Sequence, residues 1–205
     1  MTHPSVRVIR QEHAALVTVL RVWAQMQAQG PGDAPEHFFD LLRAMLFYLD
    51  EFGQRQHHPR ETSVLFPRVA RVAPETTEAL TRLDAEHARA EAEVRALQHL
   101  LLAWELLGEP RRAAFVAAAT LYQTLYFAHI QLEESLILPA AQRALTPEDW
   151  LAVDAAFDNH PRATEDWDSP SEAAALHGPE LDRLYTRIVI SAPQSMGLHP
   201  ALEYP

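Results

Sequence analysis

The segment HHPRETSVLFP, residues 57–67, is the part of the sequence that most strongly indicates the fold. His57 and Glu61 are four residues apart, and on an α-helix such residues lie one above the other on the same face. A second segment, HIQLE, repeats this spacing with His129 and Glu133. Each pair would place one imidazole and one carboxylate at the same point. Because a single pair is common by chance, the argument depends on whether the two pairs meet.

Apolar residues at helical spacing extend outward from both segments and predict a series of helices. Pro59 lies inside the second helix, where it removes a backbone hydrogen bond, so we expect a kink or bulge beside His57 and His58. Pro139 is expected to bend the end of the fourth. The expected helices cover residues 5–29, 35–72, 74–108, 110–143, 147–157 with Thr146 as N-cap, and 180–190; residues 159–171 are expected to form a loop and residues 191–205 an irregular tail.

The composition favours the same fold class. The chain has 205 residues, is 48% hydrophobic and contains only six glycines, which favours helices over a turn-rich sheet protein. With short connections between long helices, the sequence predicts an all-α fold, an antiparallel up-down four-helix bundle with additional short C-terminal helices. Residues 1–145 would form the four-helix bundle, and residues 146–205 a helical extension and tail packed on the same domain.

Charge and cysteine content exclude several function classes. The formal net charge is -11 and the basic residues are interleaved with acidic ones, so nucleic acid is not expected as a partner. There is no cysteine, so any metal must take histidine and carboxylate ligands. The N-terminal residues show no apolar signal stretch, and no apolar run approaches the roughly 18 residues needed to span a bilayer, so we expect a cytoplasmic protein without membrane contact. Whether the protein forms a homo-oligomer is left open by the sequence.

Two further histidines strengthen the case for one shared site. In an up-down bundle, positions equally far from a connecting turn lie at the same level. Glu61 and His87 match in this way within about one helical turn, and so do His87 and His129. His13 and His57 differ by five residues, about 7.5 Å at helical rise. Four helices thus each bring a histidine to roughly one layer.

A buried layer of imidazoles and carboxylates would be costly without a partner, and a metal ion satisfies both kinds of group. Nitrogen and oxygen ligands without sulfur suit iron, manganese or zinc. Glu61 and Glu133 are placed to bridge, which suits a pair of ions. The predicted metal ligands are His13, His57, Glu61, His87, His129 and Glu133, whereas His3, His37, His99, His177 and His199 are expected on polar faces or at helix caps.

The ordered motifs resemble the hemerythrin-like family, also called the HHE cation-binding domain. They are His13 in Gln-Glu-His, residues 57–67, His87 in Ala-Glu-His, and His129 to Glu133 with its trailing Leu-Pro. The resemblance covers roughly residues 5–145, and residues 150–198 are similar to the C-terminal extension of one bacterial subgroup.

The resemblance implies a left-handed four-helix bundle with two irons, bridged by two carboxylates and a solvent-derived oxygen, and an open position for dioxygen. Oxygen carriers of the family have two histidines one turn apart on the third helix, whereas this chain has His87 followed by Glu91. His58, Glu91 or Glu134 could complete the coordination, or all three could be solvated neighbours of ligands. Other residues near the site are Tyr122 and Tyr126, which could line a pocket or belong to the core.

Three functions follow as hypotheses. The first is a non-haem di-iron protein that binds dioxygen or a related small molecule, or senses iron or redox state, without enzymatic turnover. The second is an enzyme, a di-iron oxidase or a peroxide-consuming protein. The third is a bundle whose metal is structural and regulates a partner contact.

Overall fold

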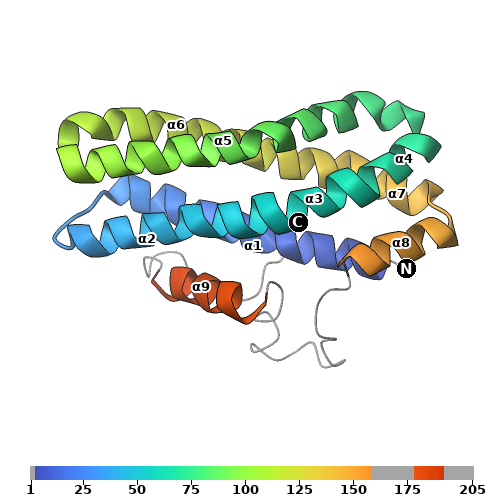
Figure 1. The fold of residues 1–205 in the computed structure, drawn as a ribbon, viewed down its shortest axis with the longest axis horizontal. Helices are drawn as coiled ribbons and strands as arrows, with labels where there is room; N and C mark the ends of the chain where they lie inside the picture. Colours follow the sequence, from blue (N-terminus) through green and yellow to red (C-terminus); the bar gives the residue numbers. More distant parts are fainter. Residues whose placement is uncertain (1–2, 158–177, 192–205) are drawn as a thin grey trace.

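The structure is a computed structural model that describes residues 3–157 and 178–191, and this described part is helical with no strand. Four long helices pack side by side, alternating in direction (Figure 1). The first contacts the second and the fourth, and the third does the same on the opposite side. The predicted all-α up-down bundle is therefore confirmed.

The helices begin and end close to the predicted positions, and three of the four are composed of two or more consecutive segments. The elements are α1 (Pro4–Gln29); α2 (Pro35–Tyr48), η1 (Leu49–His57), α3 (His58–Arg60), η2 (Glu61–Leu65) and α4 (Phe66–Val72) in the second helix; η3 (Pro74–Thr76) and α5 (Thr77–Leu107) in the third; η4 (Glu109–Arg111), α6 (Arg112–Leu132), η5 (Glu133–Ile137) and α7 (Leu138–Ala144) in the fourth; then α8 (Pro147–Phe157) and α9 (Pro179–Ile190).

Three of these segments, η1, η2 and η5, are π-helical. A proline stands two residues after the end of each: Pro59, Pro67 and Pro139. Proline cannot donate a backbone hydrogen bond and its ring crowds the carbonyl one turn earlier, so a widened turn gives it room. The bulge predicted beside Pro59 is thus present. Because π-helical turns often mark functional sites, the positions of candidate ligands at their ends are informative.

The buried apolar side chains form two clusters, one toward each end of the bundle. One contains Leu16, Trp23 and Phe115, and the other contains Ile9 and Phe66. Full burial of each such side chain stabilises the fold by roughly 1.5–3 kcal/mol. Every long helix passes from one cluster to the other, and the predicted ligands lie at the crossing. The core therefore holds a polar layer between two apolar ones.

Two shorter helices cover the bundle from outside (Figure 1). α8 packs against α1 and η2 and begins with a reciprocal cap, in which the Asp149 amide donates to the Thr146 hydroxyl at 3.2 Å and the Thr146 amide donates to the Asp149 carboxylate at 3.1 Å. This confirms Thr146 as the predicted N-cap. α9 packs against α1 and α2 through buried Ile188. The loop expected at residues 159–171 and the tail after residue 191 lie outside the described residues, so the division at residue 145 stays a prediction.

The fourth helix differs from expectation in one respect. The continuous helix Glu109–Ala144 is long and apolar enough to cross a membrane by length and composition, whereas no such segment is expected from the sequence. Length and composition do not separate a membrane span from the core helix of a bundle. Here 39% of its most apolar window is buried inside the structure, and the same helix brings His129 and Glu133 to the polar layer.

Candidate metal centre

Two groups of side chains meet in the polar layer. The first consists of His13, His57, Glu61 and Glu133, whose nearest donor atoms all lie within 4.8 Å of one another. His13 Nε2 lies 3.1 Å from His57 Nε2 and 3.2 Å from Glu133 Oε2, and His57 Nε2 lies 3.4 Å from Glu61 Oε2. All four residues are at most 1% exposed. Four helical segments, α1, η1, η2 and η5, supply one donor each.

The second group shares both carboxylates with the first and adds His87 from α5 and His129 from α6. The two Nε2 atoms are 3.0 Å apart, His129 Nε2 lies 3.2 Å from Glu133 Oε1, and His87 Nε2 lies 3.7 Å from Glu61 Oε2. Each carboxylate therefore presents donors to both histidine pairs. This is the arrangement that two bridged metal ions require.

The carboxylates themselves show that the layer fits a cation. All four oxygens of Glu61 and Glu133 are buried, and none has a well-aligned hydrogen-bond donor within the described part of the chain; their nearest polar neighbours are imidazole nitrogens, with Nε2 of His13 and Nε2 of His129 each 3.2 Å from Glu133. A buried polar atom without a partner costs roughly 1–3 kcal/mol, and more if it is charged. A bound cation would satisfy all four oxygens at once, together with the four imidazole nitrogens that face them.

Each of the four histidines is held by a side chain on the side of its ring that faces away from the layer. Its Nδ1 atom, on the side away from the layer, contacts a polar side chain, which fixes the ring and leaves Nε2 for a metal. The contacts are Glu12 to His57 at 2.8 Å, Glu134 to His13 at 3.0 Å, Thr62 to His87 at 2.8 Å and Glu86 to His129 at 2.8 Å.

These four supporting residues were missed by the sequence analysis, apart from Glu134, which had been considered as a ligand. The signal was nevertheless present, because Glu12 and Glu86 each stand immediately before a histidine of the layer. Each of these two glutamates in turn accepts a hydrogen bond from an arginine. Arg60 donates to Glu12 at 2.8 Å, and Arg82 donates to Glu86 at 2.8 Å.

Protonation balances the charge of the layer when no metal is bound. Burial alone lowers the pKa of His13, but the carboxylates of Glu133, Glu134 and Glu61 outweigh it and raise that pKa well above its ordinary value. Burial also opposes protonation of His129, yet Glu133 and Glu86 raise its pKa to about 10. These charged imidazoles hold the pKa of Glu133 well below its usual range despite its burial. Protons thus stand in for part of the positive charge of a metal.

His58 differs from its neighbours. It is 4% exposed, and burial together with the nearby imidazoles of His87, His57 and His129 lowers its pKa well below the ordinary value. Its Nε2 lies 3.2 Å from the hydroxyl of Tyr126, which is also buried. The hydroxyl of Tyr122 is buried as well.

The remaining candidates lie apart from the two groups. Glu91 is exposed and pairs with Arg95 on its own helix. His37 and His99 are exposed, and His3 stacks on Trp150 with ring centroids 4.0 Å apart. The other two histidines expected on polar faces, His177 and His199, lie outside the described residues.

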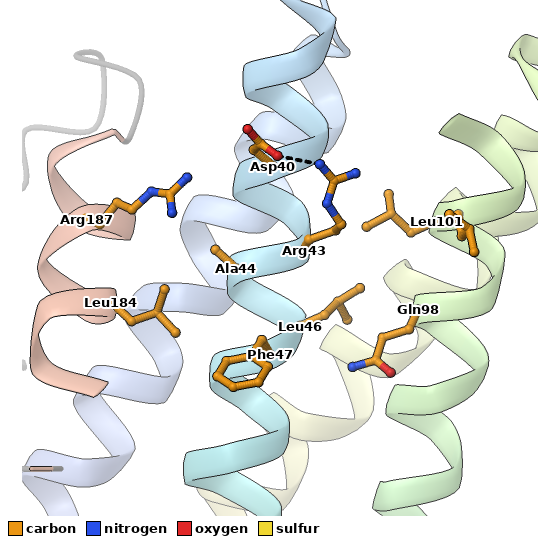
Figure 2. Close-up of a pocket in the computed structure, with 10 residues that line it drawn as sticks. Asp40, Arg43, Ala44, Leu46, Phe47, Gln98, Leu101, Leu184 and Arg187 are labelled. Carbon is orange, nitrogen blue, oxygen red and sulfur yellow. Dashed lines mark hydrogen bonds and ion pairs between the residues drawn. The ribbon is translucent and has the colours of Figure 1, made fainter. Parts of the chain in front are cut away.

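Of two hollows in the described part of the structure, one reaches the layer. A cleft of about 360 Å³ opens beside the second group and is lined by Gln54, Arg55, His87, Ala88 and Glu91. A larger hollow of about 710 Å³ lies between α2, α5 and α9 (Figure 2). Its lining is mainly apolar with the Asp40 and Arg43 pair at the rim, and it contains no histidine, so it is separate from the candidate metal centre.

Comparison with known proteins agrees with this geometry. The family model described as the hemerythrin HHE cation-binding domain matches residues 5–141. The match covers nearly the whole of the four long helices and all six predicted ligands. No curated protein matches the chain.

Proposed function

The chain belongs to the hemerythrin HHE cation-binding domain family, and from this premise we propose that it is a non-haem di-iron protein that binds dioxygen or a related small molecule, or senses iron or redox state. Proteins with this domain bind metal cations, typically iron. The groups of histidine and glutamate in the layer are suited to hold such ions. The identity of the metal, the number of ions and the small molecule are parts of the proposal.

The observation that carries the proposal is the pair of buried carboxylates that lie between two histidine pairs, with imidazole nitrogens as their nearest polar neighbours. His13 and His57 would hold one ion, His87 and His129 the other, and Glu61 with Glu133 would bridge them. When bound, an iron pair supplies reversible one-electron redox changes and a coordination position for a small molecule. The protein fixes the imidazoles through their Nδ1 contacts, and an apolar cluster lies on either side of the layer.

The second candidate function, an oxidase or peroxide-consuming enzyme, depended on additional oxygen ligands. Glu91 is exposed and paired with Arg95, and Glu134 contacts the Nδ1 atom of His13 rather than the layer. The four-histidine, two-carboxylate set that remains supports reversible binding or sensing over turnover.

The test begins with metal content. We expect protein purified without oxygen to contain two irons per chain by mass spectrometry. On exposure to air, the reduced protein should develop an absorption band that reports charge transfer from a bound oxygen species to iron. A Glu133→Ala variant should lose both properties, and His99→Ala, which changes an exposed histidine, should keep them. Iron-free wild-type protein that also fails to take up iron would overturn the proposal. Peroxide consumption faster than that of free iron would instead favour the enzyme.

A further inference from the structure

We propose that the outer face of α6 binds a second copy of this chain, so that the protein is a symmetric dimer. The outer face of α6 consists of residues that follow one another at intervals of three or four and therefore share one side of the helix: Ala114, Ala117, Leu121, Leu125 and Ala128. A dimer through this face goes beyond the proposed function and does not depend on a metal.

The outer face of α6 is apolar and exposed. Leu121 is 60% exposed and Leu125 is 44% exposed. Only 39% of the most apolar window of the helix Glu109–Ala144 is buried inside the structure, so more than half of that window stays accessible in a single copy. Covering this surface would remove apolar area from water, which favours association.

The absence of charge distinguishes α6 from its neighbours. Arg112, at its first position, is the only arginine among the 21 residues of α6, which contains no lysine, aspartate or glutamate. The adjacent long helices carry exposed charges, such as Arg10 and Arg21 on α1 and the pair of Glu91 and Arg95 on α5. A helix that is uncharged on every side has the composition of a buried helix, although one side of α6 is open.

The two helices that cover the bundle lie elsewhere. α8 packs on α1 and η2, and α9 packs on α1 and α2, so both lie on the side of the bundle away from α5 and α6 (Figure 1). Within the described residues, the outer face of α6 is therefore open to a partner.

The size of this surface suits a dimer. α6 lies between α1 and α5, so a partner laid along it would also cover the adjoining flanks of both. A strip about 30 Å long and two helix diameters wide, about 20 Å, has a projected area of roughly 600 Å², and the relief of the side chains brings its accessible area toward the about 800 Å² that each partner of a standard interface buries.

The outer face of α6 is also complementary to itself. In a two-fold dimer, the same surface of both copies must match. If the two α6 helices run antiparallel about Leu121, Ala117 of each copy lies opposite the partner's Leu125. Each large side chain then meets a small one, which lets the two helices approach closely.

Charge favours a second copy over a membrane. Each chain carries a formal net charge of -11, so two copies meet with the least repulsion through an uncharged surface. The same negative charge disfavours attachment to anionic lipids, which attract basic segments.

Sedimentation equilibrium of the full-length protein tests the dimer. Wild type should have twice the mass of the 23.1 kDa chain. Leu121→Arg brings two guanidinium groups together at the two-fold axis and should weaken the dimer at least about a hundredfold, because like charges in an interface repel. Leu151→Arg is the matched control, since it makes the same change at a leucine that is 69% exposed on α8, and it should remain dimeric.

A second variant tests the same contact without adding charge. The chain has no cysteine, so Leu121→Cys supplies a single thiol. A short bis-maleimide reagent should link two copies of this variant rapidly, whereas Leu151→Cys should stay unlinked. The circular dichroism of all four variants should match wild type.

Three outcomes would overturn the proposal. Wild type that is monomeric at every concentration up to the millimolar range would leave the face to a different partner. A dimer that Leu121→Arg leaves intact would use another surface. Monomeric wild type that binds phosphatidylcholine vesicles, when Leu121→Arg does not, would assign the face to lipid. None of these outcomes depends on metal content, so each is distinguishable from failure of the proposed function.

Discussion

At the scale of single residues, the metal centre depends on supporting residues that are adjacent in sequence to one ligand and contact a ligand on another helix. Each supporting residue stands next to a ligand but holds a different ligand, one that belongs to another helix. Glu12 precedes His13 yet contacts His57. The same holds for Glu86 beside His87, for Thr62 beside Glu61 and for Glu134 beside Glu133, which contact His129, His87 and His13.

Removing one support should weaken the metal without unfolding the chain. Glu86→Ala leaves the Nδ1 atom of His129 without its acceptor, so the affinity of the second position should fall about 10- to 100-fold. Isothermal titration with Zn²⁺ measures this loss. Glu78→Ala, which changes an exposed glutamate on the same helix, is the control. Equal affinities in the two variants would contradict the role given to Glu86.

Metal binding should release protons. His13 and His129 have raised pKa values and are therefore protonated at pH 7 in the metal-free protein, but only neutral imidazole binds a metal. Titrations in buffers of different ionisation enthalpy should reveal about two protons released per chain, and the affinity should rise with pH. A heat of binding that is independent of the buffer would contradict this protonation state.

The same pKa shift predicts how the stability of the metal-free protein depends on pH. A pKa that folding raises contributes stability that is fully present below the unfolded value, about 6.5, and is lost as the pH rises through the folded value. For His129 the folded value is about 10. Urea unfolding of the metal-free protein should therefore show lower stability at pH 10 than at pH 6. A His129→Gln variant should show a smaller decrease over this range.

At the scale of elements, the π-helical segments set where the ligands point. His57 ends η1, while Glu61 begins η2 and Glu133 begins η5. A π-helical turn is wider than an α-helical one and advances less along the axis per residue. The nine residues of η1 thus take up part of the difference in level expected between His13 and His57, whose Nε2 atoms lie 3.1 Å apart.

A close approach between η1 and α6 gives a test at this scale. A Cβ added to Gly53 would lie 2.9 Å from the hydroxyl of Tyr126, which belongs to a rigid, buried ring. Gly53→Ala should therefore destabilise the protein by about 1–3 kcal/mol through overpacking. In a Tyr126→Phe background the contact is gone, and the same change should become stabilising by up to about 1 kcal/mol through helix propensity. Urea unfolding of all four proteins checks this change of sign.

The sequence predicted the elements better than their lateral contacts. Apolar periodicity and prolines gave helix ends within one or two residues for most helices, and Pro59 indicated its bulge. Pro67 did not attract the same inference, although η2 precedes it in the same way. The layer of histidines followed from counting residues to the turns. The side chain that contacts each Nδ1 atom could not be predicted by such counting, because that contact depends on how the helices are rotated about their axes.

At the scale of the whole molecule, a polar layer separates two apolar clusters, and each of the four long helices contributes to all three. Metal ions in this layer would join the four helices at mid-length. Metal binding and folding are therefore coupled, because an ion that binds only the folded chain stabilises it.

Metal loading should raise the melting temperature. At a free metal concentration one hundred times Kd, one site adds about 2.7 kcal/mol, which corresponds to roughly 5–11 °C for a chain of this size. Calorimetry of protein loaded with Zn²⁺, and of the same protein after treatment with a chelator, measures the difference. Glu133→Ala serves as the control that should not respond. An unchanged melting temperature in wild type would exclude a stabilising metal in the layer.

Because of the cleft beside His87, the order in which metals are added should decide which ion occupies which position. His13 and His57 are sealed inside the bundle, whereas His87 lines the cleft that opens to the surface. An ion entering by this route reaches the outer position before the inner one, so the first metal supplied is expected to move inward and the second to remain near the cleft. Protein given Co²⁺ and then Zn²⁺ should differ in its visible spectrum from protein given the two in reverse order. Two samples with the same sequence and the same metal content would then differ in which position holds Co²⁺ and which holds Zn²⁺.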